Sequence, residues 1–201
     1  MNKHIIKTAS YNDEIKAVAL IHYECINLGF LSKLGPGFLF YLYLSMQNCD
    51  EIDLIVAKDE QTVIGFITGA TTLKPVLNYM LRHHFFRVIL SIIPHLFSIA
   101  NLKKIFELAN YTNINEQIGY HPEAELLSLA VKEEFRGTGV SQDLFLALKE
   151  RFKIKEHKQF KIIVGEELKA AQLFYKKMGA IESDSLNLHS NSQSIVFKVE
   201  I

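Results

Sequence analysis

A strand, a glycine turn and a helix follow one another within EAELLSLAVKEEFRGTGVSQDLFLAL, residues 123–148. The apolar run Leu126–Val131 predicts a buried strand, and the pattern after the turn predicts a helix. Gly137 and Gly139 leave the main chain without Cβ atoms, and the first N–H groups of a helix have no intrahelical partner. With the positive end of the helix dipole, these donors suit a pyrophosphate. A tight strand-to-helix connection is the other interpretation of the same glycines.

The spacing of these residues excludes two other phosphate-binding motifs. The stretch lacks the Lys-Ser/Thr ending of a P-loop, and it has no third glycine or distal acidic residue placed as a dinucleotide fingerprint requires. It resembles instead Arg/Gln-x-x-Gly-x-Gly/Ala, the acetyl-coenzyme A (acetyl-CoA) motif of the GNAT family of N-acetyltransferases, with Arg136 and Gly139 on the first and fourth positions. Ser141 stands where the family has Gly or Ala; it is still small, and its hydroxyl could cap the helix.

A second family signature lies downstream, in the order and at the separation that the family shows. Residues 171–180, AQLFYKKMGA, resemble A-x-x-F-Y-x-K-x-G-F. Leu168 departs from the pattern, because many members place Asn seven residues before the tyrosine. The resemblance implies an acetyl-CoA-dependent N-acetyltransferase (acyltransferase), in which an amine attacks the thioester directly through a tetrahedral intermediate.

The resemblance also implies an α/β fold with a central mixed sheet of six to seven strands flanked by helices. At 201 residues and 49% apolar content, the chain can bury one sizeable core, so a single domain over residues 1–201 is expected. Periodicity and turn residues predict strands at His4–Ala9, Asp53–Ala57, Val63–Thr71, Leu126–Val131, Phe160–Val164, Ile181–Ser185 and Ser194–Glu200. Four helices are expected. The first runs from a cap at Asn12 or Asp13 to about Leu28, and the second covers Phe38–Met46. The third follows the glycine turn, and the last covers Lys169–Met178 and is closed by Gly179.

Residues 73–110 stand where many family members have only a turn between their third and fourth strands. They contain apolar helical stretches, Tyr79–Ile93 and Leu102–Asn110, broken at Pro94. A helical cap over the cleft mouth is one interpretation. Docking on a membrane surface or in a homodimer is the other, because so much apolar area should not face water. Arg87 interrupts the run, which argues against a transmembrane span.

The two motifs define the donor half of the site. In this family the fourth and fifth strands splay apart, which frees main-chain groups to hydrogen-bond the pantetheine amides of acetyl-CoA. The resemblance therefore assigns cofactor contacts to the end of the fourth strand, the glycine turn and the last helix. The residues are Leu129, Ala130, Val131, Arg136, Gly137, Thr138, Gly139, Val140, Ser141, Ala171 and Phe174.

Tyr175 is the expected proton donor to the departing thiolate, because it follows Phe174 where the family's frequent general-acid tyrosine lies. Its alternative role is aromatic packing with a solvated hydroxyl. The hydroxyl matters for catalysis only in the first case.

Glu125 is the first choice for the base, because it resembles the fourth-strand glutamate of the histone-acetylating branch once the shorter turn is allowed for. Burial against the apolar insertion would raise its pKa and make it a better proton acceptor. A solvated carboxylate at a strand edge is the alternative; Glu123, Ser128 and a water chain are other candidates for the base. Strand alternation predicts one face with Glu125, Leu127, Leu129 and Val131, and another with Ala124, Leu126, Ser128 and Ala130.

The acceptor side is expected at the loop between the first two helices, which lines the cleft in this family. Phe30, Ser32 and Lys33 are the candidate contacts, and a plain helix connection is the alternative. With 22 basic and 22 acidic residues, the formal charge is zero, so no field-driven attraction to nucleic acid or an anionic membrane is implied. A small-molecule amine is expected, with an amino sugar preferred by analogy. A longer acyl donor stays open, as does a noncatalytic module that binds coenzyme A or a partner.

Histidine and cysteine spacing predicts neither a metal site nor disulfides. His83, His84 and His95 have no paired carboxylate or cysteine nearby, so no metal site is expected. Cys25 and Cys49 give no disulfide framework, which fits a reducing compartment. Because the first residues also lack an apolar export region, a cytoplasmic location is expected.

Overall fold

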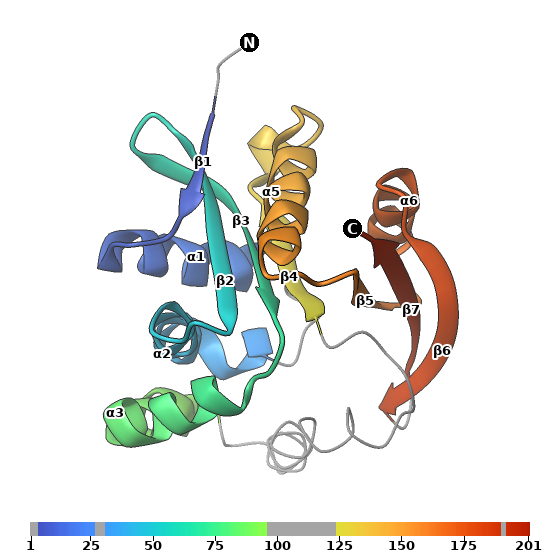
Figure 1. The fold of residues 1–201 in the computed structure, drawn as a ribbon. Coiled ribbons are helices and arrows are strands. Elements are labelled where there is room, and N and C mark those ends of the chain that lie inside the picture. The colour runs from blue at the N-terminus through green and yellow to red at the C-terminus, as the bar shows by residue number, and fades with distance from the viewer. Residues whose placement is uncertain (1–3, 27–30, 96–123, 190–191) are drawn as a thin grey trace.

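The structure is a computed structural model that describes residues 4–26, 31–95, 124–189 and 192–201. Within them, seven strands form one sheet in the order β1-β2-β3-β4-β5-β7-β6, with every pairing antiparallel except that of β4 with β5 (Figure 1). The mixed sheet of six to seven strands is confirmed. The strands are β1 Ile5–Thr8, β2 Ile52–Asp59, β3 Thr62–Ala70, β4 Ala124–Val131, β5 Gln159–Gly165, β6 Ile181–His189 and β7 Ser192–Glu200.

Helices cover both faces of this sheet. On one face lie α1 and α2, with α3 packed on the outside of α2, whereas α5 and α6 lie on the other face (Figure 1). The α-helices are α1 Asn12–Cys25, α2 Gly35–Gln47, α3 Lys74–Ile92, α5 Val140–Ile154 and α6 Lys169–Lys177. Short 3-10 helices are η1 Leu31–Leu34, η2 Ile93–His95 and η3 Glu133–Phe135.

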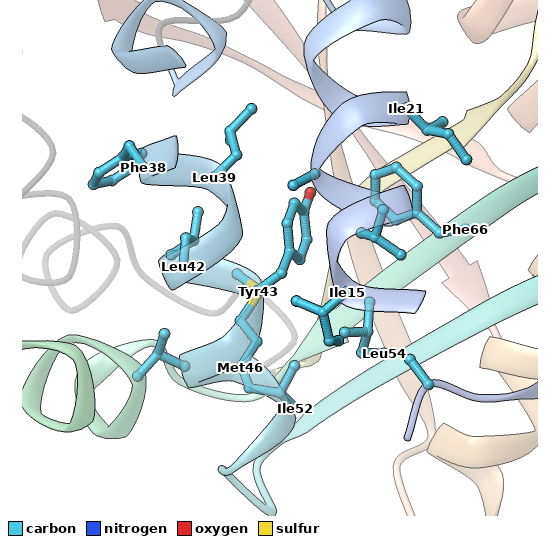
Figure 2. Packing of buried hydrophobic residues seen from close by; sticks show 14 of the residues in the cluster. Ile15, Ile21, Phe38, Leu39, Leu42, Tyr43, Met46, Ile52, Leu54 and Phe66 are labelled. Carbon is cyan, nitrogen blue, oxygen red and sulfur yellow. The ribbon is translucent and has the colours of Figure 1, made fainter. Parts of the chain in front are cut away.

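The sheet separates two apolar cores. Tyr43 of α2 and Phe66 of β3 are fully buried in the core that α1 and α2 cover (Figure 2). Phe145 and Phe152 of α5 pack with Phe160 of β5 in the other core. β2 and β3 are buried on both faces over most of their length, which explains their nearly continuous apolar sequences.

The predicted cap of the first helix is wrong. α1 begins at Asn12, with Tyr11 rather than Asn12 or Asp13 in the N-cap position and no capping bond from its side chain. Glu14, in the first turn of α1, stabilises this end of the helix instead. The carboxylate of Glu14 accepts a hydrogen bond from the Ser10 N–H at 3.0 Å, and such an anion is favoured near the positive end of a helix dipole.

Two other helix ends follow from proline and glycine. α2 starts at Gly35, three residues before the predicted Phe38, because the fixed φ of Pro36 suits the first turn of a helix. α6 ends at Lys177, one residue before the predicted end. Gly179 then adopts φ +89°, a left-handed conformation that commonly closes helices, as expected.

A β-bulge in β4 makes the predicted strand alternation wrong. Ser128 pairs with Thr68 and Leu126 pairs with Gly69, so Leu127 is the extra residue on β4. Side chains alternate between the two faces of a strand, and an extra residue reverses that alternation from the bulge onward. Each face of β4 therefore carries residues from both of the predicted sets. Toward α5 and α6 lie Ala124, Leu126, Leu129 and Val131, and toward α1 and α2 lie Leu127 and Ala130.

The insertion after β3 begins with a long helix, as predicted. α3 extends over Lys74–Ile92 and continues into η2, Ile93–His95. The predicted helix Leu102–Asn110 lies outside the described residues. The predicted end of the first helix near Leu28 is wrong, because α1 ends at Cys25 and Ile26 has left the helical conformation. Among the described residues, no helix combines the length and apolar character that a membrane crossing requires.

Candidate functional site

β4 and β5 separate soon after they begin to pair. Their parallel register covers three positions, ending at Leu126 and Ile162. Beyond this point β4 stays paired with β3 as far as Val131, and β5 stays paired with β7 as far as Gly165. The expected splay is therefore confirmed. Among the described residues, no strand pairs with the facing edges beyond this point, and main-chain groups there need hydrogen bonds from side chains, water or a ligand.

The glycine turn lies directly after this opening and leads into α5. Gly137 has φ +76° and Gly139 has φ +95°, conformations that residues with a Cβ rarely adopt. A Cβ built on either glycine would meet nothing within 4 Å, so the space in front of the turn is open. Gly139 is the N-cap of α5, with no side-chain cap, and Ser141 lies inside the helix; its predicted capping role is wrong. The first N–H groups of α5 are thus without a side-chain cap.

Side chains within the turn hold its shape. Arg136 Nε donates to the Val131 carbonyl at 3.4 Å, and Thr138 Oγ1 donates to the Phe135 carbonyl at 2.7 Å. The Cys25 thiol also lies 3.7 Å from the Val131 carbonyl. That carbonyl is therefore engaged within the protein.

The residues predicted on α6 lie on the same side of the sheet as α5. The Tyr175 ring is 7% exposed and 6.2 Å from the Phe145 ring, and Phe174 meets Phe145 edge-on at 6.1 Å. Burial raises the pKa of Tyr175, so its hydroxyl stays protonated through the neutral range. A protonated hydroxyl can donate a proton, which fits the predicted role. Ala171 is partly buried beside the same core.

Gln172 is a residue that sequence reasoning missed. Its side chain is buried, and Nε2 donates to the carbonyls of Gly165 and Glu166 at 3.0 and 2.9 Å. These bonds fasten α6 to the end of β5, at the far side of the opening. The position is variable in the family signature, so the sequence carried no signal for Gln172. Leu168, which stands where many family members have Asn, is 39% exposed.

The proposed base, Glu125, lies at the narrow end of the opening. It is 8% exposed, and its Oε2 lies 3.6 Å from Nζ of Lys161, which is 6% exposed. Since Ala124 and Leu126 point toward α5 and α6, the intervening Glu125 points toward α1 and α2. The predicted effect of burial on this carboxylate stays a prediction.

Ser128, one of the other candidates for the base, is part of a buried polar cluster. Its side chain hydrogen-bonds with Tyr43, whose hydroxyl oxygen lies 2.5 Å from Nδ1 of His22. Burial lowers the pKa of His22 to about 4 and raises that of Tyr43, so both are neutral at physiological pH. The hydrogen bond with Tyr43 gives Ser128 a structural role. The other candidate, Glu123, lies outside the described residues.

The acceptor loop is described in part. Ser32 is 5% exposed, and its hydroxyl donates to the carbonyl of Ile26, which favours a packing role over contact with an acceptor. Lys33 is exposed on η1. Phe30 lies outside the described residues.

In the described part of the chain, no three His, Cys, Asp or Glu side chains are grouped as a metal site requires. His84 packs instead against aromatic rings, with centroids 5.3 Å from Tyr41 and 5.9 Å from Tyr79.

Comparisons with known proteins agree with this geometry. The sequence model of the acetyltransferase (GNAT) family matches residues 32–180. The PaiA N-acetyltransferase of Thermoplasma acidophilum, solved with coenzyme A, is 14% identical over 99% of each chain, with a TM-score of 0.62. Arabidopsis thaliana NAA60, solved with acetyl-CoA, is 16% identical over 99% of each chain, with a TM-score of 0.63. The ribosomal-protein-S18-alanine N-acetyltransferase of Escherichia coli is 12% identical over 99% of this chain and 94% of its own, with a TM-score of 0.61. No curated protein sequence matched. These three likenesses establish a shared fold.

Proposed function

Because this chain belongs to the acetyltransferase (GNAT) family, whose members use acetyl-CoA, we propose that it transfers an acetyl group from acetyl-CoA to the primary amine of a small molecule. One observation carries the proposal. The separation of β4 from β5 after Leu126 and Ile162 opens beside the start of α5, which has no side-chain cap. An extended pantetheine arm and a diphosphate need these two features next to each other.

The residues of the donor half fit this cofactor. Main-chain N–H groups from Gly137 to Ser141 would hold the diphosphate, and the open space in front of both turn glycines leaves room for it. The main-chain groups of Leu129 and the N–H of Val131 alternate along β4 with those of Ala130, which pairs with Phe66 of β3, so Leu129 and Val131 would bond the pantetheine amides on either side of Ala130. Bound acetyl-CoA would supply the thioester whose carbonyl carbon the amine attacks.

Two side chains are proposed to move protons. Glu125 takes the proton that the amine must lose, directly or through water, as the C–N bond forms. Tyr175 donates its hydroxyl proton to the sulfur as the C–S bond breaks. The amine of Lys161, 3.6 Å from Oε2 of Glu125, lies beside this carboxylate. Burial keeps the hydroxyl of Tyr175 protonated before the thiolate forms, but the raised pKa also makes it a weaker acid, so the support for its role is its position beside Phe174 in the second motif.

The proposed acceptor class is a small amine, with amino sugars tested first. Its support is the charge balance of the chain, because 22 acidic and 22 basic residues provide no excess negative charge to attract a lysine-rich protein tail. Lys33, exposed on η1, would repel a cationic acceptor such as a polyamine. Peptide α-amines are included as a competing class, since the Escherichia coli structure is an alanine N-acetyltransferase of a ribosomal protein.

The test is release of free thiol from acetyl-CoA with a panel of amines. Amino sugars, a polyamine, free amino acids and an alanine-ended peptide are compared at equal concentration, each with the wild type and Tyr175→Phe. Turnover with an amino sugar that Tyr175→Phe reduces supports the proposal. Turnover with the peptide alone would contradict the small-molecule assignment, and tight acetyl-CoA binding without turnover on any amine would indicate a noncatalytic module. Propionyl and longer thioesters, tested with the best amine, define the acyl preference.

A further inference from the structure

One face of α3 exposes large apolar side chains although the helix is firmly packed. On its inner side Val76, Met80 and Val88 are buried in the α1–α2 core, and a Cβ on Gly37 of α2 would lie 3.2 Å from Cβ of Ser91. α3 forms the outermost layer on this side of the molecule (Figure 1). The exposed apolar face, defined here with exposed fractions, comprises Leu81 54%, Phe85 44%, Phe86 78%, Ile89 41%, Leu90 66% and Ile93 45%.

The charged residues of α3 have one sign. The sequence of α3, KPVLNYMLRHHFFRVILSI, contains lysine and arginine but no aspartate or glutamate. Arg82 and Arg87 are both exposed. α2, which packs against α3, contains no charged residue at all. The chain as a whole has zero net charge, but its charges are not evenly distributed. The helix that carries the exposed apolar face has basic residues and no acidic ones, and the neighbouring α2 has no charged residue.

We propose that α3 docks this protein on an anionic lipid surface, with its exposed apolar face in the interface. A helix in the plane of a membrane combines an apolar face that enters the headgroup region with arginines that bind anionic lipids. Phe85, Phe86 and Leu90 would supply buried apolar area. Arg82 and Arg87 lie close enough along the helix to reach phosphate groups while those side chains insert.

A second copy of the chain fits this face less well. In a symmetric dimer the same surface meets itself, so the arginines of one copy would approach those of the other. Neither α2 nor α3 offers an acidic side chain to neutralise them. Lipid headgroups carry the missing negative charge. The charge pattern therefore favours an anionic membrane over self-association.

Vesicle sedimentation of the full chain tests the proposal. The protein is expected to sediment with vesicles of equimolar phosphatidylcholine and phosphatidylglycerol, to stay in solution with phosphatidylcholine alone, and to be released by salt. Phe86→Glu should weaken binding by at least about tenfold, and Arg82→Gln by about fivefold. Ile154→Glu is the matched control, because Ile154 is 64% exposed on α5 and lies outside the proposed face. It should bind like the wild type.

A tryptophan reporter separates insertion from simple adsorption. The chain contains no tryptophan, so Phe86→Trp would give a single fluorophore on the proposed face. Its emission should shift to the blue with the anionic vesicles, whereas that of Ile154→Trp should not. Absence of sedimentation with the anionic vesicles would overturn the proposal, as would equal binding to both vesicle types. A dimer in solution that Phe86→Glu dissociates, without vesicle binding, would instead identify this face as a subunit interface.

Discussion

Glu125 and Lys161 face each other across β4 and β5, with Oε2 and Nζ 3.6 Å apart, at the middle one of the three residue pairs that join these strands. Both side chains are almost entirely buried. The ion pair thus lies at the narrow end of the opening where the two strands separate. This position places the carboxylate of the proposed base next to the amine of Lys161.

Neutralising the carboxylate tests its role as the base. Glu125→Gln is expected to lower kcat by about 100-fold or more, because the amide cannot accept the amine proton. Acetyl-CoA affinity should change little, since the proposed diphosphate site, the glycine turn, lies beyond the other end of β4. Circular dichroism and thermal melting must show a folded variant, because a buried lysine without its partner is destabilising. Unchanged kcat would exclude Glu125 as the base.

Removal of the Lys161 amine tests whether the ion pair sets the pH dependence of the same step. Lys161→Met removes the cation that favours the ionised carboxylate, so the acidic limb of the kcat/KM profile should move to higher pH. Lys161→Arg keeps the charge and is the matched control, with the wild-type profile expected. A purely structural pair would lower the amount of folded protein in Lys161→Met but leave the shape of its profile unchanged.

Removal of a single hydroxyl tests the proposed acid. Tyr175→Phe keeps the ring that packs against Phe145, so stability should be nearly unchanged. If the hydroxyl protonates the leaving thiolate, kcat should fall by about 100-fold or more while acetyl-CoA affinity stays the same. Steady-state kinetics and calorimetric titration measure the two quantities separately. Wild-type kcat would leave Tyr175 with its aromatic packing role alone.

A stability prediction concerns the start of α1, away from the proposed reaction. Burial alone would raise the pKa of Glu14, but the Ser10 N–H and the ion pairs with Lys7 and Lys58, both at 3.0 Å, outweigh it and lower the pKa from 4.5 to about 2. Because the folded pKa lies below the unfolded one, this stabilisation is complete above about pH 4.5 and is lost as the pH falls toward 2.

Glu14→Gln should therefore lower the free energy of unfolding by roughly 1–2 kcal/mol at neutral pH, a figure reduced for screening of the partly exposed lysines by solvent. Urea denaturation of both proteins, repeated at successively lower pH, should show the difference shrinking. A difference that stays constant down to the acid limit would contradict the assignment.

The sequence was most informative where local chemistry dictates the backbone. Gly179 closes α6 with a positive φ, as a glycine at a helix end predicts, and Gly137 and Gly139 form the predicted turn before α5. The order of strands and helices followed from apolar periodicity in the same way. These features depend on residues close together in the chain, so a single sequence can reveal them.

The sequence was least informative where partners come from distant segments. The extra residue at Leu127 reverses the faces of β4, and nothing in an apolar run distinguishes a bulged strand from a regular one. Lys161 is 36 residues from Glu125 along the chain but becomes its partner through the parallel register of β4 with β5. Gln172 acquires its role through the path of the β5–α6 connection.

Calorimetric titration of acetyl-CoA into Gly139→Asp, beside Gly179→Asp, is the most direct test of the central claim that main-chain N–H groups of the glycine turn hold the diphosphate. The two glycines are matched, with φ +95° and +89° and open space around a built Cβ, so the backbone strain is comparable. Gly139→Asp should weaken binding by at least about 100-fold, because its carboxylate would lie beside the phosphate charges. Gly179→Asp should bind like the wild type. Wild-type affinity in Gly139→Asp would contradict the account.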